Sequence, residues 1–172
     1  MFIGLFCIAG FSMGITWAYV IPLFLKSMGL SVERIGALLS VQSLVSGVTL
    51  YLLSSKINYR RFLLLSGAYS SLGILAFGFA DKSTIFPLSL ILGTASGAMG
   101  AIHEAVIGRI AREGTYGADI GLLMLGLHSG NTIAQAISGF LISAIGYPSL
   151  FCLSAIGSLI FSVLAHIRIS KN

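Results

Sequence analysis

Charged residues are scarce in this sequence: Asp, Glu, Lys and Arg make up 9% of its 172 residues, while 56% are hydrophobic. A water-soluble domain typically has about a quarter of its residues charged, because they cover its surface. The scarcity of charge therefore excludes a soluble single domain. The mean hydropathy of +1.00 leads to the same conclusion.

Cysteine and proline are also rare, with two and three residues respectively. Cys7 and Cys152 each lie inside an apolar run, without the paired spacing of a zinc site or a disulfide framework. We interpret them as small buried hydrophobic residues, and we expect neither a metal nor a cofactor. Pro22, Pro87 and Pro148 fall near the ends of apolar runs, where proline is tolerated, so none predicts a break in mid-membrane.

Ten basic residues against five acidic ones give the chain a net charge of +5. Such a balance can indicate a nucleic-acid partner. Here, however, Lys and Arg are scattered along the links between apolar runs rather than gathered on one face. We therefore expect anionic lipid headgroups, and no nucleic acid, as their counterpart.

Six nearly uncharged apolar runs fill most of the chain. Each is about 19 residues or longer, enough at ~1.5 Å per residue to cross a hydrocarbon core of ~30 Å. They predict an all-α membrane protein, with residues 1–172 forming a single domain of six transmembrane helices. We expect the first run to remain as a helix, because it is too long for a signal-peptide core and no basic region precedes it. The predicted helices are 1–25, 35–53, 62–80, 85–107, 120–144 and 149–167.

The basic residues divide unequally between alternate links. If the N-terminus is inside the cell, the inner links and the C-terminal tail hold seven of them and the outer links three. The inner set is Lys56, Arg60, Arg61, Arg109, Arg112, Arg168 and Lys171. The outer set is Lys26, Arg34 and Lys82. Because positive residues are retained on the cytoplasmic side, we predict an integral protein of the cell membrane with both termini in the cytoplasm.

A faint internal repeat appears when the chain is shifted by 85 residues. Ile35-Gly36-Ala37-Leu38-Leu39 then faces Ile120-Gly121-Leu122-Leu123-Met124. Because each half would carry three helices, an odd number, the second copy would insert upside down relative to the first. Two inverted three-helix repeats are one interpretation, and chance similarity between apolar runs is the other.

Small residues recur at helical spacing, which lets helix backbones approach closely. Tight packing explains most of them, although weakly interlocked helices can also rock against each other. The groups are Gly10 with Gly14, Gly93 with Gly97 and Gly100, and Gly126 with Gly130.

The run 120–144 carries the most polar face. His128, Asn131, Gln135 and Ser138 recur every three or four residues and therefore share one side of a helix. Polar side chains at membrane depth turn toward a bundle interior or a wet cavity, so this stripe either lines a cavity or forms hydrogen bonds between helices. The first two helices offer matching polar faces. Our candidates for substrate contact are Thr16, Gln42, His128, Asn131 and Gln135.

Glu104 is the one acidic residue inside an apolar run, and His103 adjoins it. Burial raises the pKa of a carboxyl group, so an intramembrane carboxylate can bind and release protons near neutral pH. We consider both residues candidates for proton coupling. The alternative is that Glu104, near the end of its helix, reaches headgroup water or pairs with Arg109 or Arg112.

Serines suggest two further interpretations. Ser154, Ser158 and Ser162 have four-residue spacing, which we interpret as packing against the third helix, where Ser66 and Ser70 have the same spacing. Ser96 lies in a glycine-rich stretch that is similar to the nucleophile region of rhomboid intramembrane proteases, with His128 as its possible base. The second helix has neither the His nor the Asn that these proteases use.

Three stretches resemble one half of a major facilitator superfamily transporter. They correspond to the turn from helix 1 to helix 2, the link from helix 4 to helix 5, and the turn from helix 5 to helix 6. These stretches are Ile21 to Gly36, Arg109 to Gly121, and Ser138 to Phe151. The family signature between helices 2 and 3 is present in part: Arg60 and Arg61 supply its basic pair, while Lys56 and Tyr59 replace an acidic residue and a glycine.

The resemblance implies that helices 1 and 4 line a central pathway, that helices 2 and 5 flank it, and that helices 3 and 6 support it. Members of the family normally have twelve helices in two halves, with the substrate held between them. The resemblance therefore implies a transporter of a small solute, not an enzyme, that acts by alternating access with a second six-helix unit. A homodimer or a partner chain could supply that unit. The alternatives are a non-transporting truncated half or accessory subunit and, third, the rhomboid-like protease.

Overall fold

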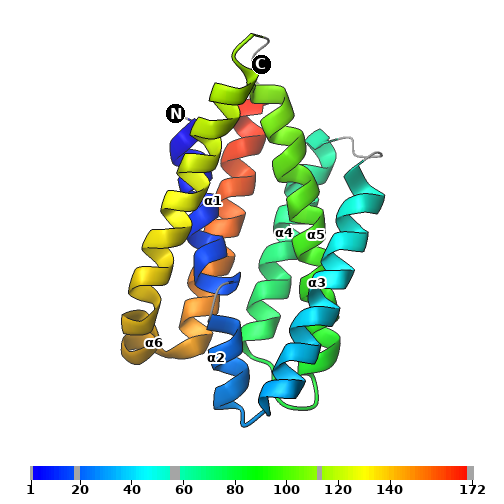
Figure 1. Cartoon of the computed structure of the whole chain (residues 1–172), viewed down its shortest axis with the longest axis vertical. Coiled ribbons are helices and arrows are strands. Elements are labelled where there is room, and N and C mark those ends of the chain that lie inside the picture. Colours follow the sequence, from blue (N-terminus) through cyan, green and yellow to red (C-terminus); the bar gives the residue numbers. More distant parts are fainter. Residues whose placement is uncertain (1, 18–19, 55–58, 112–113, 170–172) are drawn as a thin grey trace.

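The computed structural model describes residues 2–17, 20–54, 59–111 and 114–169, and these residues contain helices and no strand. Long apolar stretches favour helices in this setting, because a helix satisfies its backbone hydrogen bonds internally. Figure 1 shows the helices as an upright bundle. They are α1 (Phe2–Trp17), α2 (Val20–Ser27), α3 (Val32–Ser54), α4 (Tyr59–Gly78), α5 (Ile85–Ile110) and α6 (Tyr116–Ile169).

The chain reverses direction inside α6. Gly146 has a φ of 75° and a ψ of 169°, so two helices meet there at a non-helical residue. A glycine adopts this backbone conformation without the steric cost that a Cβ atom would add. Pro148 follows, at the start of the second helix. In Figure 1 the two halves of α6, residues 116–145 and 147–169, run along the bundle in opposite directions.

The first and last described residues lie at the same end of the bundle (Figure 1). The turn after α2, the link after α4 and the turn inside α6 lie at the opposite end, which we call the link end. At the link after α4, Asp81 Oδ1 accepts hydrogen bonds from the backbone N–H groups of Ser83 (2.9 Å) and Thr84 (2.8 Å) and from their hydroxyls. These bonds stabilise the carboxylate and hold the pKa of Asp81 well below its usual range.

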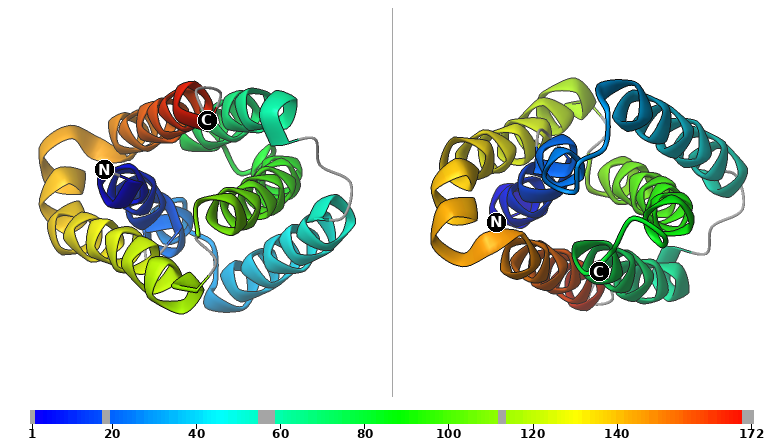
Figure 2. Two further views of the ribbon diagram at one scale, coloured as in Figure 1. Left: turned by 90° about the horizontal axis from the view of Figure 1, so that it is seen from above. Right: turned by 90° about the horizontal axis from the view of Figure 1, so that it is seen from below.

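The helices form three rows when the bundle is seen along its axis (Figure 2). α1 and α5 occupy the middle row. α3 and the first half of α6 lie on one side of it, and α4 and the second half of α6 lie on the other. α1 packs mainly against α6, α5 packs against α3 and α4, and α4 also packs against α6.

Two hydrophobic clusters hold the bundle together. One contains the aromatic rings of Phe24, Phe77 and Phe151, whose centroids lie 5.2 to 6.0 Å apart. The other surrounds Phe6 and Phe161, which meet edge to face at 5.8 Å. Aromatic pairs at these separations contribute packing that is specific in geometry as well as apolar.

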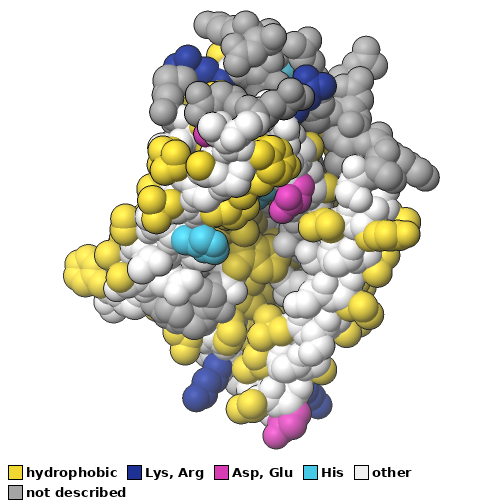
Figure 3. Space-filling view, turned by 45° about the horizontal axis from the view of Figure 1, so that its top comes forward, with side chains coloured by type: hydrophobic (Ala, Val, Ile, Leu, Met, Phe, Trp, Pro, Cys, Tyr) yellow, Lys and Arg dark blue, Asp and Glu magenta, His cyan; other side chains and the backbone are white. Residues whose placement is uncertain are grey.

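Four described stretches are long and apolar enough to cross a membrane: Phe2–Ser27, Val32–Ser54, Ile85–Ile110 and Tyr116–Arg168. The last contains the reversal at Gly146, so it passes along the bundle twice. α4 contributes a shorter apolar stretch, Phe62–Gly78. On the face in Figure 3, Lys and Arg side chains gather at the two ends, and hydrophobic side chains cover much of the region between them. This distribution is that of an integral membrane protein.

Candidate functional site

The polar stripe of α6 forms a connected group. Gln135 Nε2 donates a hydrogen bond of 2.6 Å to Asn131 Oδ1, and the hydroxyl of Ser138 donates one of 2.9 Å to the backbone carbonyl of Gln135. Ser138 is buried, Asn131 and Gln135 are half-buried, and His128 is exposed. The stripe therefore runs from the interior of the bundle to its surface.

Glycines bring this stripe against α1. A Cβ atom added at Gly14 would lie 2.7 Å from Asn131 Oδ1, and one at Gly10 would overlap the carbonyl of Leu127. Gly126 and Gly130 on α6 are equally close to the backbone of α1. Because both helices carry glycines at the contact, their backbones approach closely and hold the amide of Asn131 in place.

Thr16 faces another direction. It is fully buried, and its hydroxyl bonds with the Ser154 hydroxyl and donates to the Ser12 carbonyl at 3.1 Å. The hydroxyls of Ser12 and Ser154 each donate to the other's backbone carbonyl, at 2.6 and 2.8 Å. These bonds join α1 to the second half of α6. On α1, Thr16 therefore lies on the face opposite to Gly14, which contacts Asn131 of α6.

Gln42 is buried on α3, with 2% of its surface exposed. Its Nε2 has no hydrogen-bond partner among the described residues. Buried amide groups are normally hydrogen-bonded, so an orphaned one indicates a place for water or a ligand. The backbone of Gln42 packs on Gly93 of α5, which fixes the depth of the side chain.

His103 and Glu104 point to different sides of α5. His103 is buried and stacks edge to face on Phe161 at 4.8 Å, and its Nε2 has no partner among the described residues. Glu104 is exposed. The structure therefore does not bring these two neighbouring side chains to one face.

The basic links are described in part. Arg109 is exposed near the end of α5. Arg60 and Arg61 belong to the first turn of α4, but their side chains lie outside the described part of the chain, as does the whole of Arg112. In the described residues, no group of three or more His, Cys, Asp or Glu side chains could hold a metal ion.

A cavity of about 160 Å³ lies among α1, α3, α4, α5 and the second half of α6. We call it the central cavity. Hydroxyl groups from all five of these segments and the imidazole of His103 line it, together with apolar side chains. Its polar lining is Ser12, Ser46, Ser70, Ser96, Ser158 and His103.

Sequence reasoning missed this cavity, although it noticed the serines. Ser162 does lie against Gly67 of α4. Ser154, however, bonds with α1, and Ser158 lines the central cavity. The four-residue spacing of these serines was the available signal, but spacing alone does not tell which helix they face.

Ser96 also belongs to the central cavity. It accepts a hydrogen bond of 3.2 Å from the hydroxyl of Ser46. The histidine that shares the cavity with it is His103, whereas the predicted base, His128, is not among the lining residues. The arrangement combines hydroxyl donors and acceptors with one imidazole, which suits the binding of a small polar molecule.

A family model described as Major Facilitator Superfamily matches residues 1–171 of the chain. The search of curated proteins found no match.

Proposed function

The chain belongs to the major facilitator superfamily, a family of transporters rather than enzymes, and we propose that it transports a small solute by alternating access together with a second six-helix unit. The observation that carries this proposal is the central cavity, which lies between the two helices of the middle row, α1 and α5. Those are the helices that the family resemblance assigns to the pathway.

The small size of the cavity supports the proposed need for a second unit. Small-molecule sites usually measure about 300–1,000 Å³, and the central cavity measures about 160 Å³. One chain therefore offers part of a substrate site. In our proposal a second copy of this chain, related by a twofold axis, supplies the other part. A separate partner chain is the alternative.

We propose that residues 1–172 form one domain that crosses the membrane six times, with both termini in the cytoplasm. The six crossings would be α1 with α2, then α3, α4, α5 and the two halves of α6. The shared end of the first and last described residues supports an even number of crossings. The excess of Lys and Arg at that end supports its cytoplasmic placement.

Two inverted three-helix repeats would explain the packing. α1 packs against both halves of α6, and α5 packs against α3 and α4. The first helix of each repeat would thus pack against the last two helices of the other repeat. This exchange gives α1 and α5 equivalent places in the middle row, and in our proposal one six-helix unit rocks against the other around a site at the membrane midplane.

We propose that His128, Asn131 and Gln135 of α6 and Gln42 of α3 contact the solute outside the central cavity, whose lining contains none of these four residues. The unpartnered Nε2 of buried Gln42 and the half-buried positions of Asn131 and Gln135 support this role. Contact between Thr16 and the solute stays a prediction. The hydroxyl of Thr16 is hydrogen-bonded to Ser12 and Ser154. We also propose that His103 and Glu104 serve proton coupling. The imidazole of His103 borders the central cavity, and Glu104 is exposed.

Asn131→Leu tests the substrate site. A panel of small solutes is screened for thermal stabilisation of the purified protein, and solutes that stabilise it are followed into proteoliposomes. We expect the variant to lose uptake to background with little change in Tm, because leucine fills the same space without the amide. Ser129→Leu, on the exposed side of the same helix, is the matched control and should transport normally.

Uptake by the Asn131→Leu variant at the normal rate would remove this residue from the site. If no solute crosses when the wild-type protein is reconstituted as a dimer of confirmed mass, the chain is a non-transporting half or accessory subunit. The mass of the detergent-solubilised protein distinguishes the dimer from the monomer in either case.

A further inference from the structure

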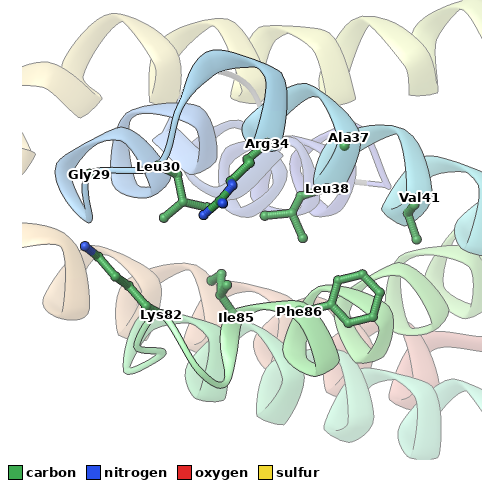
Figure 4. Close-up of a pocket in the computed structure, with 9 residues that line it drawn as sticks. All are labelled: Gly29, Leu30, Arg34, Ala37, Leu38, Val41, Lys82, Ile85 and Phe86. Carbon is green, nitrogen blue, oxygen red and sulfur yellow. The ribbon is translucent and has the colours of Figure 1, made fainter.

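A second opening lies at the link end, between the start of α3 and the start of α5 (Figure 4). It has a volume of about 350 Å³, and we call it the lateral groove. Two cationic side chains, Arg34 and Lys82, line it together with apolar side chains that include Ala37, Val41 and Phe86. The proposed transport function uses none of these residues.

The two cations reach into the lateral groove from opposite walls. Arg34 extends from α3, and Lys82 extends from the link before α5 (Figure 4). Within the described part of the chain neither forms an ion pair with a carboxylate. The carboxylate of Asp81, which is next to Lys82 in the sequence, accepts hydrogen bonds from Ser83 and Thr84 instead. Among the described residues the groove therefore presents two cations without an ion-pair partner, although the carboxylates of Glu33 and Asp81 are their neighbours in the sequence.

The apolar wall continues from the charges toward the middle of the bundle. One stripe of α3 carries Arg34 and the lining residues that follow it by three, four and seven positions. These residues are Ala37, Leu38 and Val41. From Arg34 to Val41 this stripe extends about 10 Å along the helix. Phe86 of α5 faces it and is 55% exposed.

The lateral groove opens away from the central cavity. Ser46 and Leu50 are the α3 residues that line the central cavity, and they lie on a different side of the helix from the Arg34–Val41 stripe. In Figure 4, the ribbons of α1 and α6 lie behind the groove. Its mouth therefore opens to the outside of the bundle, where a lipid can reach it.

We propose that the lateral groove binds an anionic phospholipid. The phosphate lies between Arg34 and Lys82 at the membrane interface, and one acyl chain follows Ala37, Val41 and Phe86 into the apolar layer. A phosphate diester with an acyl chain fits both parts of the groove, since it matches two unpaired cations at one end and an apolar wall beyond them. A soluble anion would use only the charged end.

The test compares two lipids on the full-length purified protein in neutral detergent micelles. Phosphatidylglycerol should raise the Tm, and native mass spectrometry should show it retained in preference to phosphatidylcholine. The Arg34→Gln/Lys82→Gln double variant should lose this preference. We expect a weakening of roughly fivefold for each charge removed. Val41→Trp, which fills the apolar wall, should also weaken retention.

Lys26→Gln is the matched control, because Lys26 is an exposed cation at the same end of the bundle and does not line the groove. It should retain the lipid preference. All variants should keep the wild-type Tm in phosphatidylcholine alone, because the altered side chains lie on the surface of the groove rather than in the core.

Unchanged phosphatidylglycerol preference in the double variant would overturn the proposal. Equal stabilisation by glycerol phosphate without acyl chains would also overturn it, since the groove would then be a free-anion site. Neither result bears on transport, which is measured separately with the Asn131 variant.

Discussion

The stretch formed by α1 and α2 and the helix α3 have nearly the same mean hydropathy but contrasting positions in the bundle. In the stretch formed by α1 and α2, 62% of the most apolar window is buried within the protein, against 11% for α3. α1 lies between the two halves of α6, whereas α3 packs along one side of α5. Hydropathy therefore predicts that a helix enters a membrane, but it does not predict how much of the helix other helices cover.

Small and polar residues explain the difference. α1 meets the first half of α6 through glycines on both helices and meets the second half through a cluster of hydroxyls. At the contact between α3 and α5, the close glycines are on α5. The other sides of α3 expose large apolar residues, including Tyr51 at 77% and Leu44 at 69%. Such a surface suits lipid or a second copy of the chain.

The largest loss of stability is expected from a substitution at the contact between α1 and α6. In Gly130→Ala the new Cβ would overlap the carbonyl of Cys7, and backbone atoms on both sides leave no flexible group to move. We expect a loss of stability of about 3 kcal/mol or more, measured by thermal unfolding in detergent. Gly139→Ala is the control, because no described atom lies within 4 Å of the added Cβ. It should not reduce Tm.

A smaller effect is expected where α3 meets α5. In Gly97→Ala the new Cβ would overlap the Ser46 carbonyl and approach Thr49 Cβ to 2.7 Å. α3 is held along one side and can shift, so we expect a loss of about 1–2 kcal/mol. Gly47→Ala on α3, with open space at its Cβ among the described atoms, is the control. A loss as large as that of Gly130→Ala would mean that α3 is held as firmly as α1.

Removing a hydroxyl from the cluster between α1 and α6 is the next test. Ser154→Ala deletes the group that donates to the Ser12 carbonyl and bonds with Thr16. We expect a loss of about 1–2 kcal/mol, because buried partners are left without a hydrogen bond. Ser143→Ala on the exposed part of α6 should be close to neutral in the same unfolding assay. Equal effects would show that the cluster adds no stability to α1.

The smallest loss of stability is expected from a substitution in the link that leads into α5. The pKa of Asp81 is lowered in the folded protein, chiefly by the hydrogen bonds from Ser83 and Thr84. A depressed carboxyl pKa contributes stability above the unfolded pKa, and this contribution is lost as pH falls through the folded pKa. Asp81→Ala should therefore lower Tm slightly at neutral pH, and the difference from wild type should shrink only in strong acid. Asp81→Asn keeps an oxygen acceptor but cannot titrate, so it should lower Tm less than Asp81→Ala and should remove this pH dependence. If the Tm difference between Asp81→Ala and wild type stays constant across pH, ionisation of the Asp81 carboxylate is excluded as the cause of the stabilisation.

Sequence patterns predicted local features better than contacts between distant helices. The resemblance to the family is confirmed by the family model that matches the chain. The positive φ of Gly146 falls between the predicted helices 120–144 and 149–167. The spacing of Asn131 and Gln135 placed them on one face of a helix, and a hydrogen bond joins them.

The remaining features depend on how the helices are arranged. Thr16 and Ser154 are far apart in sequence, and no periodicity on either helix reveals that their hydroxyls meet. The central cavity needs one or more residues from each of five segments, so it has no signature in any one of them. The exposure of α3 likewise follows from its position at the edge of the bundle, because an apolar helix in a membrane can face lipid or protein.

Since the first and last described residues lie at one end of the bundle, two copies could be joined head to tail by a short polar tether. The tether would remain on one side of the membrane and would not need an additional spanning segment. Both copies would then insert with the same orientation. Such a concatemer would fix the stoichiometry at two and would allow a substitution to be made in one copy alone.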